Sequence, residues 1–299
     1  LEMTSYGYCY QSLIYQALQR ASIRSKEIDS CFNYLTELAG YIRLNANLQL
    51  NEDEFDDFNK LYREKYIGAV GTSFFESLEL ANILFKSDDK IGFKYRYIYY
   101  FFCGKYMSDR LAEKGDSGVH IDKLIADLHK EENANILVFI THHTRDPKIL
   151  ENIQLSLLSM FKESQPAGLT VKEMSYIKDF IDNLPDLVVE HRDIQAERQK
   201  KYEREDEEES DARKRDEGLE DVEADELLAR INQLFKAIDV VGQIVRNKYG
   251  SLEKRVMQDL ILESYKASFR FLNDFLHASD AIQKDIVAAL EWMLKEQPN

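Results

Sequence analysis

Helix-breaking residues are scarce in this chain, and their scarcity limits the folds open to it more than any other feature. Only 12 of the 299 residues are glycine and only 4 are proline. A β fold with many tight turns needs these residues, whereas long helices exclude them. Apolar residues recur every three or four positions through most of the chain, which is the spacing of one helix face. We therefore expect an all-α fold.

One short region departs from the helical pattern. Residues 83–86 and 91–95 are largely apolar runs on either side of a polar turn at residues 87–90, a pattern typical of a β-hairpin. Three helices, this hairpin and a further helix follow one another, which is the element order of a winged helix. The predicted helices lie at residues 6–18, 25–44, 51–67, 74–82, 97–112, 121–129, 134–142, 147–161, 171–183, 227–245, 251–277 and 279–294.

A charged segment divides the chain. Residues 193–226 contain 16 acidic and 7 basic residues and few apolar ones, so this segment cannot bury enough surface to fold by itself. It is either a disordered linker or a solvated helical extension. We therefore predict four parts: an N-terminal helix with a winged-helix domain at 1–113, a helical arm at 114–192, an acidic linker at 193–226 and a C-terminal helical bundle at 227–299.

The net charge of −15 argues against a general affinity for nucleic acid or for anionic membranes. Residues 72–82, which occupy the position that reads DNA in a winged helix, include Glu76 and Glu79 but no lysine or arginine. The aromatic residues 95–106 could stack on single-stranded nucleic acid, but burial of an aromatic helix explains them better. The most apolar stretch, residues 95–107, is too short and too interrupted to cross a bilayer. We therefore expect protein partners, and neither nucleic acid nor membrane.

The sequence lacks the residue patterns of a complete catalytic site. It contains no GxxxxGK[ST] loop, which would wrap backbone amides around a phosphate, and no GxSxG or HExxH motif. His142 and His143 are the best metal candidates, but adjacent residues of a helix point about 100° apart. We interpret both histidines as residues of a helix end, and an enzyme that uses either of them is the weaker alternative. No catalytic residue, metal or cofactor is expected in this chain.

We predict that the isolated chain neither binds ATP tightly nor hydrolyses it, because no phosphate-binding loop is present. Titration calorimetry with ATP and magnesium measures the binding, and phosphate release compared with a boiled control measures the hydrolysis. Micromolar affinity, or turnover above the boiled control, would contradict this prediction.

The three cysteines, Cys9, Cys31 and Cys103, are odd in number and form no CxxC pattern. This usage is typical of buried thiols in a reducing compartment. The sequence does not open on a basic segment followed by an apolar run, as a signal peptide would. We therefore expect a cytoplasmic protein.

Residues 93–107, FKYRYIYYFFCGKYM, resemble the helix that follows the wing in STAND-type (NACHT-like) signalling NTPases, whose pattern there is roughly FxHxxIQEYFAAxxL. Residues 6–18, 135–143 and 241–252 are similar to bacterial members of that family associated with antiphage defence. The resemblance implies that this chain is a C-terminal regulatory region, and that ATP or ADP binds with Mg²⁺ in a nucleotide-binding domain upstream. The chain would relay a trigger, from an unknown protein or ligand, to that domain by interdomain contacts and self-association. The alternative is a free-standing helical adaptor or scaffold.

In that family the winged helix packs against the nucleotide-binding domain, and a histidine of the helix after the wing senses the nucleotide phosphates. The resemblance assigns this nucleotide-sensing position to Tyr95. Tyrosine can donate a hydrogen bond but carries no positive charge at neutral pH, so the chain departs from the family here.

The helix at residues 95–107 is apolar on all sides and therefore needs burial on all sides. We expect the neighbouring helices to leave one side for the absent nucleotide-binding domain. Tyr95, Tyr99 and Tyr106 lie on roughly one side of the helix and are the predicted interdomain docking residues. The alternative is that the helical arm covers the helix completely.

Overall fold

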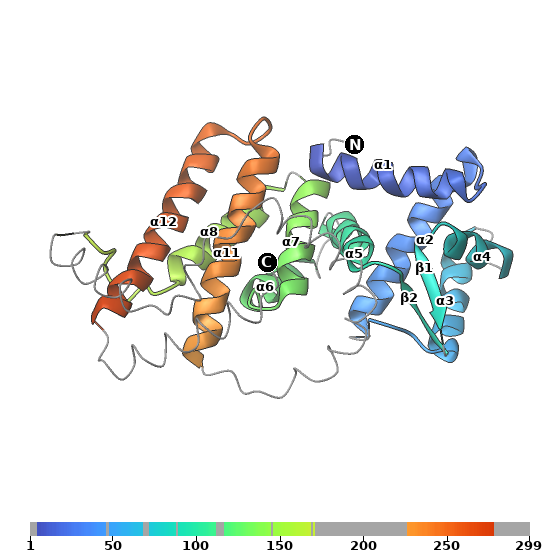
Figure 1. The fold of residues 1–299 in the computed structure, drawn as a ribbon, viewed down its shortest axis with the longest axis horizontal. Coiled ribbons are helices and arrows are strands. Elements are labelled where there is room, and N and C mark those ends of the chain that lie inside the picture. The colour runs from blue at the N-terminus through green and yellow to red at the C-terminus, as the bar shows by residue number, and fades with distance from the viewer. Residues whose placement is uncertain are drawn as a thin grey trace, which may run out of the picture. The chain divides into compact units, whose positions relative to one another are not determined.

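The computed structural model describes residues 5–45, 48–67, 72–87, 89–111, 117–144, 146–168, 170 and 226–277. The helices predicted at 171–183 and 279–294, and the acidic segment up to residue 225, lie outside these residues. The described part is mostly helical with one two-stranded antiparallel hairpin, which confirms the all-α fold class (Figure 1). None of the described helices combines the length and the apolar character that crossing a membrane requires.

The helices and strands follow the predicted order. They are α1 (Ser5–Arg20), α2 (Ser25–Leu44), α3 (Glu52–Lys65), α4 (Thr72–Leu80), β1 (Leu84–Ser87), β2 (Lys90–Phe93), α5 (Arg96–Leu111), α6 (Ser117–Ala126), α7 (Glu131–His143), α8 (Pro147–Ser159), α11 (Glu226–Lys248) and α12 (Lys254–His277).

Local hydrogen bonds explain several helix boundaries. The Asn51 side chain accepts a bond from the Glu54 amide (2.9 Å), and the Glu54 carboxylate accepts one from the Asn51 amide (2.8 Å), so α3 starts with a capping box. The predicted start of α12 at residue 251 is wrong. The amides of Ser251 and Leu252 bond back to the Lys248 carbonyl and close a turn instead. Helix α6 begins at Ser117, four residues before the predicted start at residue 121.

The chain forms two compact units, each built from two separate stretches. Unit 1 consists of residues 1–156 and 236–261, and unit 2 of residues 157–235 and 262–299. The division runs through α8, α11 and α12. The boundaries expected at residues 113, 192 and 226 remain a prediction.

Helix α5 is central to unit 1, where it packs against α2 and α7. Two glycines allow this close approach. A Cβ atom on Gly104 of α5 would lie 2.6 Å from the Cβ of Phe139 in α7, and one on Gly40 of α2 would overlap the ring of Tyr106. Helix α5 therefore approaches the backbone of α7 at Gly104, and its Tyr106 ring fits against α2 at Gly40, so that α5 is fixed between the other two helices.

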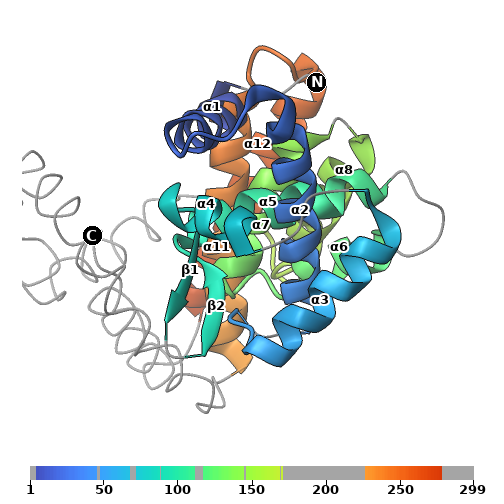
Figure 2. The ribbon, with the colours of Figure 1, turned by 90° about the vertical axis from the view of Figure 1, so that its right-hand side faces the viewer.

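The hairpin precedes α5 directly. β1 and β2 pair in register from Leu84 opposite Phe93 to Ser87 opposite Lys90, which confirms the predicted hairpin. Leu50, between α2 and α3, exchanges two backbone hydrogen bonds of 2.8 Å with Ile91 of β2. β1 packs beside α4, and β2 beside α3 and α5 (Figure 2).

Unit 2 is held together by a buried arginine of α12. Helix α8 ends in this unit, and Phe161 just beyond it takes a left-handed conformation with φ of 51°. The Arg270 guanidinium donates to the carbonyls of Leu157 (2.7 Å) and Met160 (2.9 Å) at that helix end, and to the carboxylate of Glu263 (2.9 Å). The Leu157 carbonyl also accepts the Met160 amide at 3.2 Å, so Arg270 of α12 adds hydrogen bonds to the carbonyls at this helix end.

Candidate docking site at the start of helix α5

The hairpin determines where α5 begins. The amide of Lys94 bonds to the Ile83 carbonyl at 2.8 Å and ties the end of β2 to the start of the hairpin. The Tyr95 carbonyl then accepts the amides of Ile98 (3.1 Å) and Tyr99 (3.3 Å), which opens the first turn of α5. Tyr95 therefore lies at the junction of the hairpin and the helix.

Three tyrosines form an aromatic row at this junction, which we define as Tyr10, Tyr95 and Tyr97. The rings of Tyr95 and Tyr97 are stacked, with centroids 5.4 Å apart and planes within 13°. Tyr97 is 36% exposed and contacts Tyr10 of α1 at 5.5 Å. Tyr10 in turn meets the edge of Phe139 in α7 at 5.2 Å. The row thus extends from the surface at the start of α5 to the core of unit 1.

Tyr99 is not part of that surface, and the expectation that it faces outward is wrong. Its side chain is only 3% exposed, and its hydroxyl donates to Glu132 of α7 at 3.3 Å. The same carboxylate pairs with Arg43 of α2 at 2.7 Å. Burial, followed by the neighbouring Cys103, raises the pKa of the Tyr99 phenol, so the ring stays neutral. Helix α7 occupies the side of α5 that we expected to be left for a partner domain.

Tyr106 also packs within the chain. Its half-buried ring lies against Gly40 of α2, and the Arg110 guanidinium sits 3.5 Å from the ring centroid. Arg110 is held by both carboxylate oxygens of Glu37, at 2.9 and 3.0 Å. Burial raises the pKa of Tyr106. Tyr95, Tyr99 and Tyr106 therefore share no single exposed side, and a docking role for Tyr95 or Tyr106 remains a prediction.

Tyr97 is the exposed residue that the sequence interpretation missed. Helical spacing places residues three or four apart on one face, and Tyr97 is only two residues from Tyr95. Tyr95 precedes the helix, however, so this spacing does not govern the pair. The sequence signal available was the charge of Arg96 between them, which indicates that the start of residues 95–107 faces solvent. Arg96 is exposed in the structure.

The two histidines end α7, as the interpretation of a helix end requires. The His143 ring nitrogen Nε2 lies 3.2 Å from the Phe101 carbonyl, which can only accept, so Nε2 carries the proton. Burial and then Lys105 lower the pKa of His143 to about 3, and burial and then Lys248 lower that of His142 to about 4. Both rings are neutral at neutral pH. Within the described ranges, no group of three or more His, Cys, Asp or Glu residues could hold a metal ion.

The cysteines differ in exposure. Cys31 and Cys103 are buried as expected, and burial raises the pKa of their thiols to about 11 and about 12. Cys9 is exposed on α1, so the expectation of burial is wrong for this residue. All three thiols are free of disulfide bonds.

A pocket of about 380 Å³ lies between α2, α5 and the end of α3. Its charged lining residues are Asp29, Lys105 and Asp109, and the ammonium of Lys105 pairs with Asp109 at 2.8 Å. A nucleotide phosphate needs positive charge, and here the lysine is already offset by an acid and a second acid is nearby. The pocket therefore does not suit a nucleotide phosphate.

A comparison with known protein families finds a match over the hairpin and the start of α5. Residues 49–103 match the model of the family described as Novel STAND NTPase 4. The matched stretch contains the Leu50 bridge, α3, α4, both strands and the first half of α5. No curated protein and no solved structure matches the chain.

Proposed function

We propose that the chain belongs to the STAND NTPase family, whose model matches residues 49–103, and that it is a regulatory region that relays a trigger to a nucleotide-binding domain outside it. The matched stretch carries the proposal because it is the part of the chain that contains the hairpin and the start of α5. ATP or ADP with Mg²⁺ would bind in that other domain. The relay would act by interdomain contacts and self-association, in a bacterial antiphage response.

We further propose that α2, α3, α4 and the hairpin are a winged helix. Such a domain places a short strand between its first two helices and pairs it with the hairpin, and the bridge between Leu50 and Ile91 supports this arrangement. Helix α4 then takes the position of the DNA-reading helix. It carries Glu76 and Glu79, and Leu80 at its end is 71% exposed. An acidic helix that ends in an exposed leucine fits a protein partner better than a phosphate backbone.

The docking surface in this proposal is the aromatic row. Its tyrosines present apolar rings with polar hydroxyl groups, which suits a surface that is exposed to solvent when free and buried against the partner domain when docked. Tyr95, at the position that the resemblance gives to the nucleotide sensor, is part of the row. Because Tyr95 brings no positive charge, the row would sense the position of the partner domain and not the phosphates directly.

Helix α5 supports the relay itself. It starts at the aromatic row, and farther along it is wedged against α7 at Gly104 and against α2 at Gly40. The pair between Arg43 and Glu132 joins α2 to α7 beside it. Close-packed interiors do not deform continuously, so a displacement at the start of α5 would move the neighbouring helices as well. Two packings that differ by a few kcal/mol would suffice for a switch.

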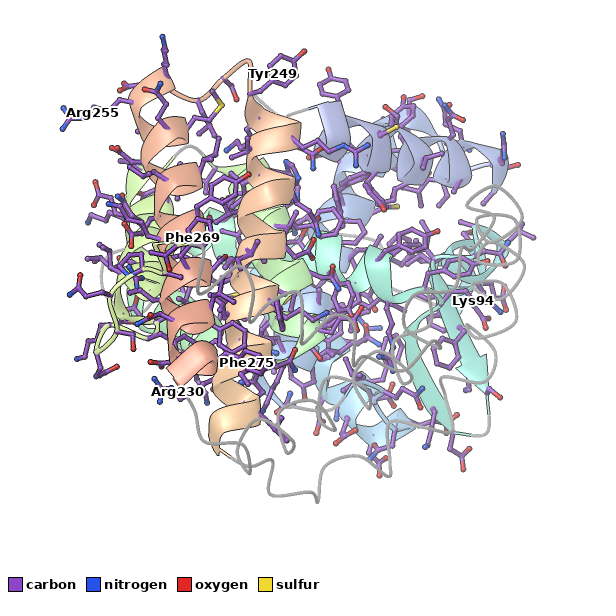
Figure 3. All side chains as sticks on the ribbon, turned by 60° about the vertical axis from the view of Figure 1, so that its left-hand side comes forward. Lys94, Arg230, Tyr249, Arg255, Phe269 and Phe275 are labelled. Carbon is purple, nitrogen blue, oxygen red and sulfur yellow. The ribbon has the colours of Figure 1, made fainter. Side chains whose placement is uncertain are left out.

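We predict that Tyr97→Ala weakens binding of this chain to the nucleotide-binding domain of the same full-length protein by about 2 kcal/mol, as for an interface hot spot. The measurement is titration calorimetry between the two purified parts, in ADP and in ATP. Tyr249→Ala is the matched control, because Tyr249 is 76% exposed at the turn between α11 and α12 and points away from the ribbon (Figure 3).

Equal affinities for the wild type and the two variants would show that the aromatic row is not part of the interface. A full-length protein without any phosphate-binding loop would exclude the NTPase relay and favour the adaptor.

A further inference from the structure

Unit 1 contains a stretch of chain that returns to it from far along the sequence. Residues 236–261 belong to this unit together with residues 1–156, although residues 157–235 intervene. We call residues 236–261 the strap. It comprises the second half of α11, the turn that includes Tyr249, and the start of α12.

The strap carries an apolar row along α11. Ala237, Val240, Val241 and Ile244 recur at helical spacing, and each is at most 3% exposed. Such a row stabilises by burial alone and does not select one position along a neighbouring helix, because the hydrophobic effect is not directional. A directional contact is needed to fix where the strap sits.

Lys248 supplies that contact. It lies one turn beyond Ile244 and is only 6% exposed, and its ammonium donates to the carbonyls of Thr141 and Thr144, the latter at 3.2 Å. Both carbonyls belong to the C-terminal end of α7, where they have no partner within the helix. A cation is favoured at this end of a helix by the helix dipole as well.

The surroundings of Lys248 make this contact specific. His142 of α7 lies within electrostatic reach of Lys248, and the pKa of this histidine is lowered by burial and then by the lysine charge, so the imidazole is neutral. The ammonium is therefore not opposed by a second cation at neutral pH. Asp146 is engaged at the start of α8, where its carboxylate accepts the amide of Lys148 at 2.9 Å.

We propose that the strap is a separable element of unit 1 and that Lys248 is the latch that holds it on the end of α7. The remainder of the unit has its own interlocked core, because α5 is wedged between α2 and α7 at Gly40 and Gly104. Opening of the latch uncovers the end of α7 while that core stays folded. This inference rests on the geometry of unit 1 and not on the family assignment, so it stands whether or not the chain serves an NTPase.

Hydrogen exchange measured by mass spectrometry on the full chain tests the latch. In Lys248→Met the long apolar stem is kept and the charge is removed. We expect amides of α11 from residue 236 to 248 and of the last turn of α7 to exchange roughly tenfold faster, as follows from losing buried hydrogen bonds worth about 1.4 kcal/mol. Amides of α2 and α5 should keep the protection seen in the wild type.

The matched control is Arg246→Met, which removes a positive charge two residues earlier from an exposed position of the same helix. Its exchange should equal that of the wild type. Unchanged exchange of α11 in Lys248→Met would show that Lys248 is not the latch. Equal acceleration, or unfolding, of α2 and α5 together with α11 would show that the strap is an inseparable part of the core.

Discussion

Replacing Arg270 with alanine is expected to lower the free energy of unfolding by about 3–5 kcal/mol, the range observed when one partner of a buried ion pair is removed. The variant removes the buried partner of the Glu263 carboxylate, which lies 2.9 Å from the guanidinium and whose side chain is almost fully buried, and leaves that carboxylate with the half-exposed Lys266 at 3.6 Å. It also removes the donor to the carbonyls of Leu157 and Met160 at the end of α8. Urea unfolding followed by circular dichroism at the helix band measures the loss.

Lys266→Ala is the matched control for this prediction. The Lys266 ammonium lies 3.6 Å from the same Glu263 carboxylate, but its side chain is 46% exposed. Exposed ion pairs contribute about 0–1 kcal/mol, so this variant should remain close to the wild type. Similar small losses in both variants would contradict the assignment of Arg270 as the residue that holds unit 2 together.

A double variant separates the two parts of the Arg270 effect. Glu263→Leu combined with Arg270→Met removes both charges, so no carboxylate is left stranded. It should recover part of the stability lost in Arg270→Ala, and what remains lost reports on the two carbonyls of α8. A double variant as unstable as Arg270→Ala would assign the whole effect to those carbonyls.

Features of the fold that depend on neighbouring residues could be predicted from the sequence. The periodicity of residues 25–44 predicted both ends of α2 correctly, and the helix predicted to start at residue 51 is the one that Asn51 caps, α3. The hairpin followed from two short apolar runs around a polar turn. In each case the signal and the structure that it specifies lie within the same few turns of chain.

The covering of α5 could not be predicted in the same way. An all-round apolar helix signals that every side is buried but does not say by what. Helix α7 is itself buried along most of its length, and Gly104 allows it to approach α5 more closely than a larger residue would. From the sequence alone, Gly104 indicates only a residue of low helix propensity. Its role in the packing of α5 follows from the structure, in which Phe139 of α7 lies against it.

Polar contacts between distant residues are equally hidden in the sequence. Lys248 and Arg270 read as ordinary surface cations of amphipathic helices, yet each is buried against the carboxyl end of a helix more than 100 residues earlier in the chain. Local pattern carries no information about which helix end a basic side chain will reach. Both residues follow one physical rule, because the carbonyls and the negative dipole end at the C-terminus of a helix favour a cation.

Tyr99→Ala is expected to destabilise the chain by about 3–5 kcal/mol, the usual effect of truncating a buried aromatic residue. The ring packs against Phe93 at 5.8 Å, and the hydroxyl bonds to Glu132. Tyr99→Phe keeps the ring and loses only the hydroxyl, so it should lower stability by about 1 kcal/mol. Urea unfolding of both variants measures the two contributions separately.

Tyr97→Ala is the matched control, since Tyr97 is an exposed tyrosine two residues earlier on the same helix. It loses the stacking of its ring on Tyr95 and the tilted contact with Tyr10, and its stability should fall by at most about 1 kcal/mol. The two variants should therefore differ in both measurements. Tyr99→Ala unfolds more easily but, while folded, binds the nucleotide-binding domain as the wild type does. Tyr97→Ala keeps its stability and binds that domain less tightly. If Tyr99→Ala instead kept its stability and lost binding, the side of α5 that carries Tyr99 would be the docking face, and α7 would have to leave it when the partner arrives.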